Sequence, residues 1–401
     1  MKHAIQQGSL LDMPALENKE MKPSQPVTEK KMSRLEELIA ELCPNGVKFE
    51  KLEDHCLLLD SERRPVTKKD RTSGIYPYYG ANGIQDYVGD YIFDGTFLLV
   101  GEDGSVITPS GNPILNWTTG KIWVNNHAHI LSEKEGTSLR YLYYVLQGVN
   151  ISSVVRGTPP KLNQKNLNNI VIPVPPLPVQ EEIVRILDKF AELTAELTAE
   201  LTKRKQQYQY YRDTLIKTAY GIEWKSFDEI CFLSAGGDVP KENFSKEKTE
   251  EYDIPVFSNG IGENALYGYT NIAKITSRCV TIAARGTIGY CELRKNPFFP
   301  IIRLICAVPK QGMLADYLKY ITETITFKVP TSGIPQLTVP MLKAYKVPVP
   351  PLEEQERIVA ILDRFDALCH DLTSGLPTEI EARKKQYEYY RDKLLTFKEA
   401  V

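Results

Sequence analysis

A stripe of apolar residues runs through the middle of the chain at helical spacing. Its members return every three or four positions: Ile183, Leu187, Phe190, Leu193, Leu197 and Leu201. This is the spacing of one face of an α-helix. Pro175 and Pro176 precede the stripe, and neither Gly nor Pro occurs from 179 to 220. The pattern predicts a helix over residues 179–217, roughly 58 Å long at 1.5 Å per residue.

A second stripe near the C-terminus has the same spacing. Its apolar positions are Ile358, Leu362, Phe365 and Leu368. The segment SGLP (374–377) interrupts it, because Gly375 and Pro377 disfavour a continuous helix. Long amphipathic helices need an apolar partner, so we expect residues 179–217 and 353–396 to pair as an antiparallel coiled coil. TAELTAEL (194–201) doubles a four-residue unit of helix formers, each unit adding roughly 6 Å.

The chain contains a large internal repeat. PVPPLPVQEEIVRILDKF (173–190) returns as PVPPLEEQERIVAILDRF (348–365), an offset of 175 with 13 of 18 positions identical. The same offset relates GVKFEKLEDHC (46–56) to GIEWKSFDEIC (221–231), while KRKQQYQYYRDTLI (203–216) returns at an offset of 179 as ARKKQYEYYRDKLL (382–395). A period this long indicates two whole domains rather than a solenoid.

The segments before the helices, 46–172 and 221–347, consist of short apolar runs bounded by turns. They predict α+β domains with sheets of mixed direction. YPYYGANGI (76–84) resembles IPVFSNGI (254–261), and VGEDGS (100–105) aligns with AARGTI (283–288). Outside this skeleton the segments diverge, which is the pattern expected of two domains that bind different sequences.

Composition restricts the class of protein without identifying it. The chain has 401 residues and a net charge of −2, which alone argues against nucleic-acid binding. It lacks an apolar run of about 18 residues, and residues 1–31 read as a polar, flexible leader rather than a secretory signal. Seven cysteines without a C-x-x-C pair predict buried, reduced thiols in a cytoplasmic protein. His127 and His129 have no evident third partner, so no metal site is predicted.

Polar residues suited to phosphates and base edges occur in the segments expected to be loops. In the first domain the candidates are Arg63, Arg64, Lys68, Lys69, Lys121, Asn125, Asn126, Lys161, Asn163, Gln164 and Lys165. In the second domain they are Ser258, Asn259, Arg278, Arg285 and Arg303. No phosphate-binding loop, nucleophile elbow or zinc-peptidase motif is found in the sequence, so no catalytic residue is predicted.

With these motifs in hand, the chain resembles the specificity subunits of type I restriction–modification enzymes. The likeness runs from about residue 33 to the C-terminus and rests on the two PVPPL…Q-E-x-I-V-x-I-L-D-x-F segments, the TAEL repeat and the paired Q-Y-x-Y-Y-R-D segments. The TAEL repeat and residues 374–395 are most similar to the type IC branch, typified by the EcoR124 enzymes. Two alternatives stay open: a diverged DNA methyltransferase or nuclease, and a coiled-coil adaptor that does not bind DNA.

The resemblance implies a fold and a set of partners. It implies two target recognition domains (32–178 and 221–352), a central conserved helix (179–220) and a C-terminal conserved helix (353–401), arranged as a pseudo-twofold duplication. It also implies a non-catalytic, DNA-binding subunit in phage defence. Its partners would be double-stranded DNA, two methyltransferase subunits that use S-adenosylmethionine, and two motor–nuclease subunits that use ATP and Mg²⁺. Those subunits would supply the cationic surface that a net charge of −2 lacks.

Overall fold

The structure is a computed structural model that describes residues 33–330, 333–370 and 375–400. The predicted leader, 1–31, lies outside the described residues. The chain divides into two compact units by internal contacts: unit 1 comprises Met1–Ile186 and Asp392–Val401, and unit 2 comprises Leu187–Arg391. The long helical segments are therefore shared between the two units.

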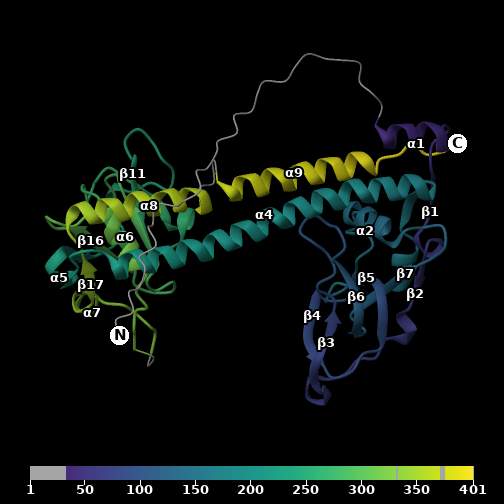
Figure 1. Ribbon diagram of the computed structural model, residues 1–401, viewed down its shortest axis with the longest axis horizontal. Coiled ribbons are helices and arrows are strands. Elements are labelled where there is room, and N and C mark those ends of the chain that lie inside the picture. The colour runs from purple at the N-terminus through teal and green to yellow at the C-terminus, as the bar shows by residue number, and fades with distance from the viewer. Residues whose placement is uncertain (1–32, 331–332, 371–374, 401) are drawn as a thin grey trace, which may run out of the picture. The chain divides into compact units, whose positions relative to one another are not determined.

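Unit 1 contains a six-stranded mixed sheet and a separate two-stranded sheet (Figure 1). Its strands are β1 Lys48–Lys51, β2 Cys56–Leu58, β3 Ser73–Gly80, β4 Gly83–Val88, β5 Phe93–Gly101, β6 Leu115–Val124, β7 Ala128–Glu133 and β8 Val171–Val174. Its helices are α1 Arg34–Leu42, α2 Leu139–Gly148, α3 Gln164–Asn168 and the start of α4. The six-stranded sheet has the order β2-β7-β5-β6-β3-β4, with only β3 and β6 parallel among these pairs, and β1 pairs separately with β8. The predicted mixed sheet is confirmed.

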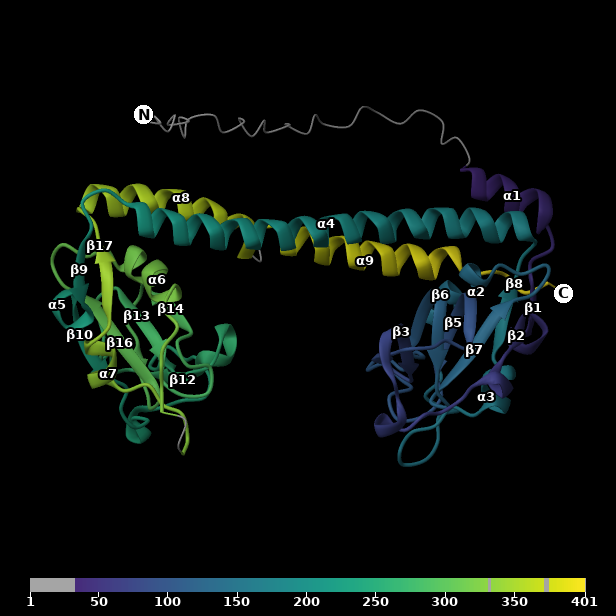
Figure 2. The same cartoon turned by 60° about the horizontal axis from the view of Figure 1, so that its bottom comes forward.

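Unit 2 repeats this plan with shorter strands (Figure 2). Its strands are β9 Glu223–Ser226, β10 Cys231–Ala235, β11 Ile254–Phe257, β12 Leu266–Thr270, β13 Cys279–Ala283, β14 Cys291–Arg294, β15 Phe299–Pro300, β16 Leu304–Pro309 and β17 Lys346–Val349. Its helices are α4 Leu177–Thr218 (continuing from unit 1), α5 Phe227–Ile230, α6 Ala315–Glu323, α7 Val339–Lys343, α8 Leu352–His370 and α9 Leu376–Leu394. The order β10-β16-β13-β14 matches β2-β7-β5-β6, and β12-β11-β15 matches β4-β3-β6.

The strand registers correct one detail of the sequence alignment. Gly101 pairs with Ala128 across β5 and β7, and Ala283 pairs with Leu304 across β13 and β16. Gly101 of unit 1 therefore corresponds to Ala283 of unit 2, whereas the sequence match placed Val100 there. The alignment of VGEDGS with AARGTI was wrong by one residue. In short segments of similar residues, a sequence alignment can shift by one position, whereas the hydrogen bonds between strands define the register.

The long helices agree with the predicted boundaries to within two residues, apart from the interruption. α4 is 42 residues long, and the second predicted helix is observed as α8 and α9. Gly375 lies between them as expected, whereas Pro377 lies in the first turn of α9. Within unit 2, the rings of Phe190 and Tyr390 stack at 5.3 Å, and those of Tyr211 and Phe365 lie 5.4 Å apart. Because residue numbers rise along α4 as they fall along its partner, these segments lie antiparallel (Figure 2). Coiled-coil packing in detail stays a prediction.

The apolar stripes differ in burial along their length. Ile183, Leu187, Ile358 and Leu362 are fully buried. Leu193, Leu197, Leu201 and Phe365 are half-buried, and Leu368 is exposed. In the part of the chain that the structure describes, none of the helices is long and apolar enough to cross a membrane.

The last residues of the chain leave the helix and return to unit 1. α9 ends at Leu394, short of the predicted helix end at 396. Val47 N–H donates to the carbonyl of Lys398 at 2.8 Å, and Ala400 N–H donates to the carbonyl of Val47 at 2.9 Å. Gly46 adopts φ +101°, and a side chain there would meet the Lys398 carbonyl at 2.6 Å. The C-terminal segment is therefore hydrogen-bonded to the backbone of unit 1 at Val47.

A fully buried glutamine fixes the start of α4 to unit 1. Gln180 Oε1 accepts a hydrogen bond from Ser138 N–H at 2.9 Å. Its Nε2 donates to the carbonyls of Pro175 at 2.8 Å and Gly136 at 3.4 Å. One side chain thus bonds backbone groups of the loop before α2 and of the Pro-Pro turn before α4. Without the glutamine these groups would be buried without hydrogen-bond partners.

The same contacts recur at the start of α8 in unit 2. Gln355 Oε1 accepts from Leu314 N–H at 2.9 Å, and its Nε2 donates to the carbonyls of Gly312 at 3.0 Å and Pro350 at 2.9 Å. Gln355 is also fully buried. The glutamine that the two sequence motifs share is therefore a structural connection between each helix and its domain.

We predict that Gln355→Leu destabilises unit 2. The apolar side chain leaves Leu314 N–H and the carbonyls of Gly312 and Pro350 buried without partners, each costing about 1–3 kcal/mol. Native-state hydrogen exchange read by mass spectrometry should show faster exchange in α6, with unit 1 peptides unchanged. The exposed Gln206→Leu on α4 is the control. Unchanged protection of α6 in Gln355→Leu would contradict this role.

Candidate nucleic-acid interface

Most of the predicted DNA-contacting residues of unit 1 are exposed. They are Arg64, Lys68, Lys69, Lys121, Asn126, Lys161, Asn163, Gln164 and Lys165. They come from the segment before β3, the edge of β6, the β6–β7 turn and the segment entering α3. Their exposure is compatible with contacts to phosphates or base edges.

The basic stretch before β3 is held in place by its last arginine. Arg71 Nη1 donates to Asp86 Oδ2 at 3.2 Å, and Arg71 Nε donates to the carbonyl of Val66 at 3.1 Å. The pKa of the Asp86 carboxyl is lowered because the backbone N–H of Tyr87 and then Arg71 donate hydrogen bonds to it. Arg71 is thereby bonded within unit 1, whereas Lys68 and Lys69 of the same stretch are exposed.

Lys121 has an aromatic neighbour. Its ammonium lies 4.4 Å from the centroid of the Tyr91 ring. The hydrogen bond with Tyr91 raises the pKa of Lys121 further above neutrality. Lys121 is thus an exposed cation beside an aromatic ring, as a phosphate contact requires.

Arg63 has a structural position rather than an exposed one. Its guanidinium donates to Glu102 Oε2 at 2.5 Å and to the Ala128 carbonyl at 2.8 Å, and it lies 3.3 Å from Asp60 Oδ2. Only 13% of its side chain is exposed. Arg63 as a DNA contact stays a prediction, and its donors are bonded to carboxylates inside unit 1. Removing such a partner typically costs about 3–5 kcal/mol.

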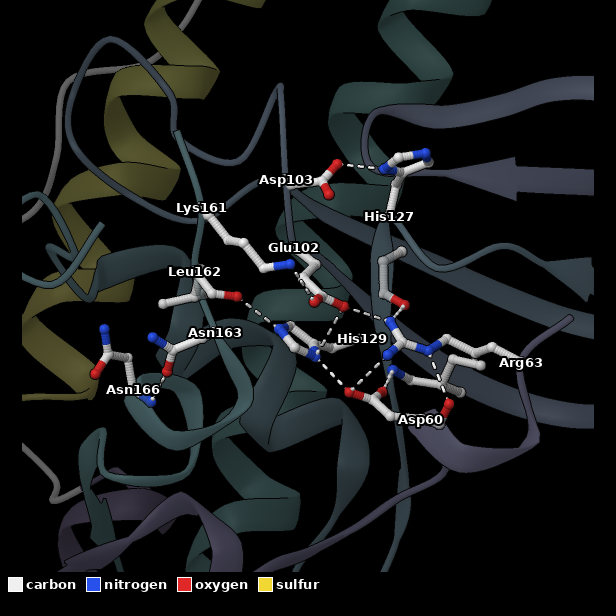
Figure 3. Close-up of polar contacts among 12 residues, drawn as sticks. Asp60, Arg63, Glu102, Asp103, His127, His129, Lys161, Leu162, Asn163 and Asn166 are labelled. Carbon is white, nitrogen blue, oxygen red and sulfur yellow. Dashed lines mark hydrogen bonds and ion pairs between the residues drawn. The ribbon is translucent and has the colours of Figure 1, made fainter. Parts of the chain in front are cut away.

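The same cluster contains a buried histidine (Figure 3). His129 Nδ1 lies 2.5 Å from Asp60 Oδ2, and His129 Nε2 lies 2.8 Å from the Leu162 carbonyl. Since the carbonyl only accepts, Nε2 carries a hydrogen. Lys161 adds a second cation, 3.1 Å from Glu102 Oε1.

Three of these side chains also have the spacing of a metal site. Ligand atoms of Asp60, Glu102 and His129 all lie within 4.8 Å of one another. The guanidinium of Arg63 and the ammonium of Lys161 already neutralise the two carboxylates. The donor set is therefore better matched to the protein's own cations than to a metal ion. His127 does not join it, because its Nδ1 contacts Asp103.

Two predicted asparagines also have structural contacts. Asn125 is 3% exposed; its Oδ1 accepts from His127 N–H at 2.8 Å, and its Nδ2 donates to Gln85 Oε1 at 3.2 Å. Asn125 therefore stabilises the β6–β7 turn, and its contact with DNA stays a prediction. Asn163 caps α3 by accepting from Asn166 N–H at 2.9 Å, although it remains exposed.

In unit 2 the structure brings several predicted residues together in adjoining loops. Asn259 Nδ2 donates to the carbonyl of Arg285 at 2.7 Å, and Ser258 N–H donates to the Ala265 carbonyl. The carbonyl of Arg303 accepts from Ala284 N–H at 2.8 Å. Ser258, Asn259, Arg285 and Arg303 therefore belong to one cluster beyond the end of β13.

Arg278 lies outside this cluster. Although its side chain is 52% exposed, its Nη2 donates to Asp316 Oδ1 at 2.8 Å, at the start of α6. It therefore contributes a contact between the β12–β13 segment and α6.

Sequence reasoning missed two residues that lie beside the predicted ones. Asp103 is paired with His127, and Gln336 accepts a hydrogen bond from Arg285 Nη2 at 3.1 Å. Asp103 is acidic and Gln336 lies in a poorly patterned loop, so neither carried a signal for DNA binding. Their significance depends on proximity in space.

The cysteines agree with the sequence prediction where they are described. Cys43, Cys56, Cys231, Cys279, Cys291 and Cys306 are buried and free. Burial raises the pKa of Cys56 and of Cys231 to about 12, so both remain protonated thiols. The side chain of Cys369 lies outside the described residues.

Comparisons with known proteins agree with this duplicated arrangement. The family model for the type I restriction modification DNA specificity domain matches twice, at residues 44–204 and 221–382. A Haemophilus influenzae protein assigned as a type I restriction enzyme specificity subunit is 35% identical, covering 88% of this chain and 96% of that protein. The EcoR124I/EcoR124II specificity subunit of Escherichia coli is 33% identical, covering 75% of this chain and 85% of the relative.

Solved structures agree at the level of fold. The S subunit of a type I restriction–modification system from M. genitalium matches with a TM-score of 0.55 at 16% identity, covering 87% of this chain and 95% of that one. A chain from a study of type I R-M complex assembly gives a TM-score of 0.54 at 18% identity, covering 88% and 98%. The two domain matches and the similarity to relatives over most of their length place this chain in the type I restriction–modification DNA specificity family, as a non-catalytic specificity subunit.

Proposed function

We propose that each unit reads one half of a bipartite DNA site. The observation that carries this proposal is one backbone frame, present twice, with different polar side chains at its loops. A shared frame presents its loops in the same way in both units. Different side chains on those loops then favour different short sequences, since base edges are distinguished by their donors and acceptors.

We propose further that α4 and its antiparallel partner set the length of unread DNA between the half-sites. α4 is one uninterrupted helix of 42 residues, roughly 63 Å long. Its TAEL segment is half-buried or exposed throughout, so packing restricts its length only weakly.

The chemistry on DNA would belong to partner subunits. Two methyltransferase subunits that bind S-adenosylmethionine would methylate adenine N6 and flip the target base, docking on the helical faces at 179–217 and 353–396. Two motor–nuclease subunits would use ATP and Mg²⁺. The recurrence of the helix sequence at 173–190 and 348–365 supports two equivalent docking positions. The partners would supply the positive surface that a net charge of −2 lacks. The complex would work in the cytoplasm.

The first prediction concerns dependence on the partner. The purified chain with S-adenosylmethionine should methylate no DNA, whereas co-expression with its methyltransferase subunit should give adenine methylation at one bipartite motif, read by long-read sequencing. Methylation by the chain alone would contradict the assignment of the chemistry to the partner.

The second prediction tests the division of reading between the units. Replacing residues 46–172 with the corresponding segment of a relative should change one half-site and leave the other half-site and the spacer unchanged. Methylome sequencing of cells that carry the chimaera and the partner subunit gives the readout, with replacement of 221–347 as the reciprocal control. A change in both half-sites from one exchange would rule out independent readers.

The third prediction tests the helices as a measure of spacing. Inserting one further TAEL unit after Leu201 adds about 6 Å, against roughly 3.4 Å per base pair, so the spacer should lengthen by about one to two base pairs. Both half-sites should stay the same, because the insertion lies outside the loops. A four-residue insertion into residues 1–31 is the control, and a changed half-site in the TAEL variant would contradict the proposal.

A further inference from the structure

The backbone beyond the central strand is the same in both units. In unit 1, Glu102 N–H donates to the His127 carbonyl, and Leu162 N–H donates to the Glu102 carbonyl, both at 2.8 Å. In unit 2, Ala284 N–H donates to the Arg303 carbonyl, and Leu337 N–H donates to the Ala284 carbonyl, again at 2.8 Å. Glu102 therefore corresponds to Ala284, His127 to Arg303, and Leu162 to Leu337.

This correspondence identifies three matched pairs of side chains around the same point. We name Asp103, His127 and Lys161 triplet 1, and Arg285, Arg303 and Gln336 triplet 2. Asp103 and Arg285 each follow the shared hydrogen-bonded residue, and each precedes a glycine at positive φ, +78° at Gly104 and +75° at Gly286. All six triplet residues are at least partly exposed.

The frame around the triplets is kept, while the charge of their first member is inverted. Leu162 and Leu337 are both buried, at 0% and 1% exposure. At the adjoining tip, however, unit 1 presents the carboxylate of Asp103 and unit 2 presents the guanidinium of Arg285. Where two units share the same backbone but one presents an acceptor and the other a donor, they are expected to prefer different bases.

Arg285 is held in an orientation with unused donors. Its Nη2 donates to Gln336 Oε1 at 3.1 Å, and its carbonyl is fixed by Asn259 Nδ2 at 2.7 Å. Within the described parts of the chain, its buried Nε finds no hydrogen-bond partner. The guanidinium has five N–H groups, and one Nη2 hydrogen is engaged by Gln336, so the outer nitrogens keep donors for a ligand. A guanidinium in this state is suited to two parallel bonds to guanine O6 and N7.

The neighbouring Arg303 adds backbone strain at the same place. Its φ is +72°, the one positive value recorded for a non-glycine residue in the described chain. This conformation is disfavoured for residues with a side chain and tends to occur at functional sites. The strained turn brings the Arg303 carbonyl to Ala284, directly before Arg285.

Asp103 has a chemistry that only certain DNA contacts allow. Figure 3 shows Asp103 and His127 directed toward each other, next to the Glu102 cluster. Phosphates repel a carboxylate, so an aspartate in a DNA interface is favourable where it accepts a hydrogen bond from an amino group of a base. Those groups are cytosine N4 and adenine N6 in the major groove.

We propose that Asp103 and Arg285 are the base-reading residues at equivalent positions of the two units. Asp103, oriented by His127, accepts from the exocyclic amino group of cytosine or adenine in one half-site. Arg285, oriented by Gln336, donates two hydrogen bonds to a guanine in the other half-site. This inference rests on the proposed function of the two units.

The test measures base preference separately from methylation. The full chain in complex with its methyltransferase subunits is equilibrated with duplexes in which each half-site is randomised in turn, and bound sequences are counted. In Arg285→Gln and Arg285→Lys, the preference for G at one position of one half-site should fall about 5- to 150-fold, with the other half-site unchanged. Asp103→Asn should produce a loss of similar size at one position of the opposite half-site.

Matched variants remove the same charge elsewhere in each unit. Lys248→Gln in unit 2 and Glu135→Gln in unit 1 are exposed positions away from the triplets, and both should keep the wild-type preference at every position. Gln336→Ala should weaken the preference at the same position as Arg285→Gln, because it removes the side chain that orients the guanidinium.

Two results would overturn the inference. One is a base preference within twofold of wild type at every position for Arg285→Lys and Asp103→Asn. The other is an affinity that falls equally for all sequences, as expected of a phosphate contact or a misfolded loop. The proposed function fails separately: if exchanging residues 221–347 leaves both half-sites unchanged, the units are not the readers. If the exchange moves a half-site and the point variants do not, only the reading residues are wrong.

Discussion

The buried glutamine at the start of each long helix is the contact that makes two variable domains compatible with one conserved scaffold. A single side chain satisfies a backbone N–H from the loop before the domain's helix and two carbonyls, one from that loop and one from the Pro-Pro turn. Because these groups belong to the backbone, the contact places no demand on the loop side chains. Reading loops can therefore change while the attachment of helix to domain stays the same.

The two units stabilise the same loops by different physical means. In unit 1, Asp60, Arg63, Glu102 and His129 form a charged cluster beneath the loop that carries Lys161. The registers of β2 with β7 and of β10 with β16 place Ala235 where unit 1 has Asp60. Buried ion pairs add little net stability over apolar packing, so either solution supports the fold. What the charged cluster adds is geometric restriction of the loop that approaches Asp103.

Periodicity and repetition predicted the scaffold, because both can be read from the sequence without knowing which distant residues are in contact. The helix expected at 179–217 is observed at Leu177–Thr218, and Gly375 lies between α8 and α9, near the expected break. The C-terminal end was less well predicted, since pairing of Lys398 and Ala400 with Val47 depends on a contact 350 residues away in sequence. The alignment of Val100 with Ala283 failed for a related reason, because strand register is set by partners rather than by residue similarity.

The candidate site was harder to predict because a charged side chain looks the same in sequence whether it faces solvent or a partner. Arg63 and Lys68 stand five residues apart in one basic stretch, yet Arg63 is committed to Glu102, 39 residues away, and Lys68 is exposed. Asp103 was not considered, because an acidic residue gives no signal when cations are sought. Only the matched backbone bonds of Glu102 and Ala284 reveal that Asp103 and Arg285 occupy one position.

Three positions that recur in both helices are also among the most buried residues of the chain. Gln180 and Gln355, Ile183 and Ile358, and Leu187 and Leu362 are identical pairs and all fully buried. The TAEL segment is the exception within the helices: its leucines are half-buried, and the hydroxyls of Thr194, Thr198 and Thr202 each bond the carbonyl four residues earlier. Four residues turn the helix by about 400°, so an added unit returns each side chain to nearly the same face. The TAEL segment is half-buried or exposed, and each added unit is close to one full helical turn. The helix can therefore change its length there without altering the packing at its buried ends.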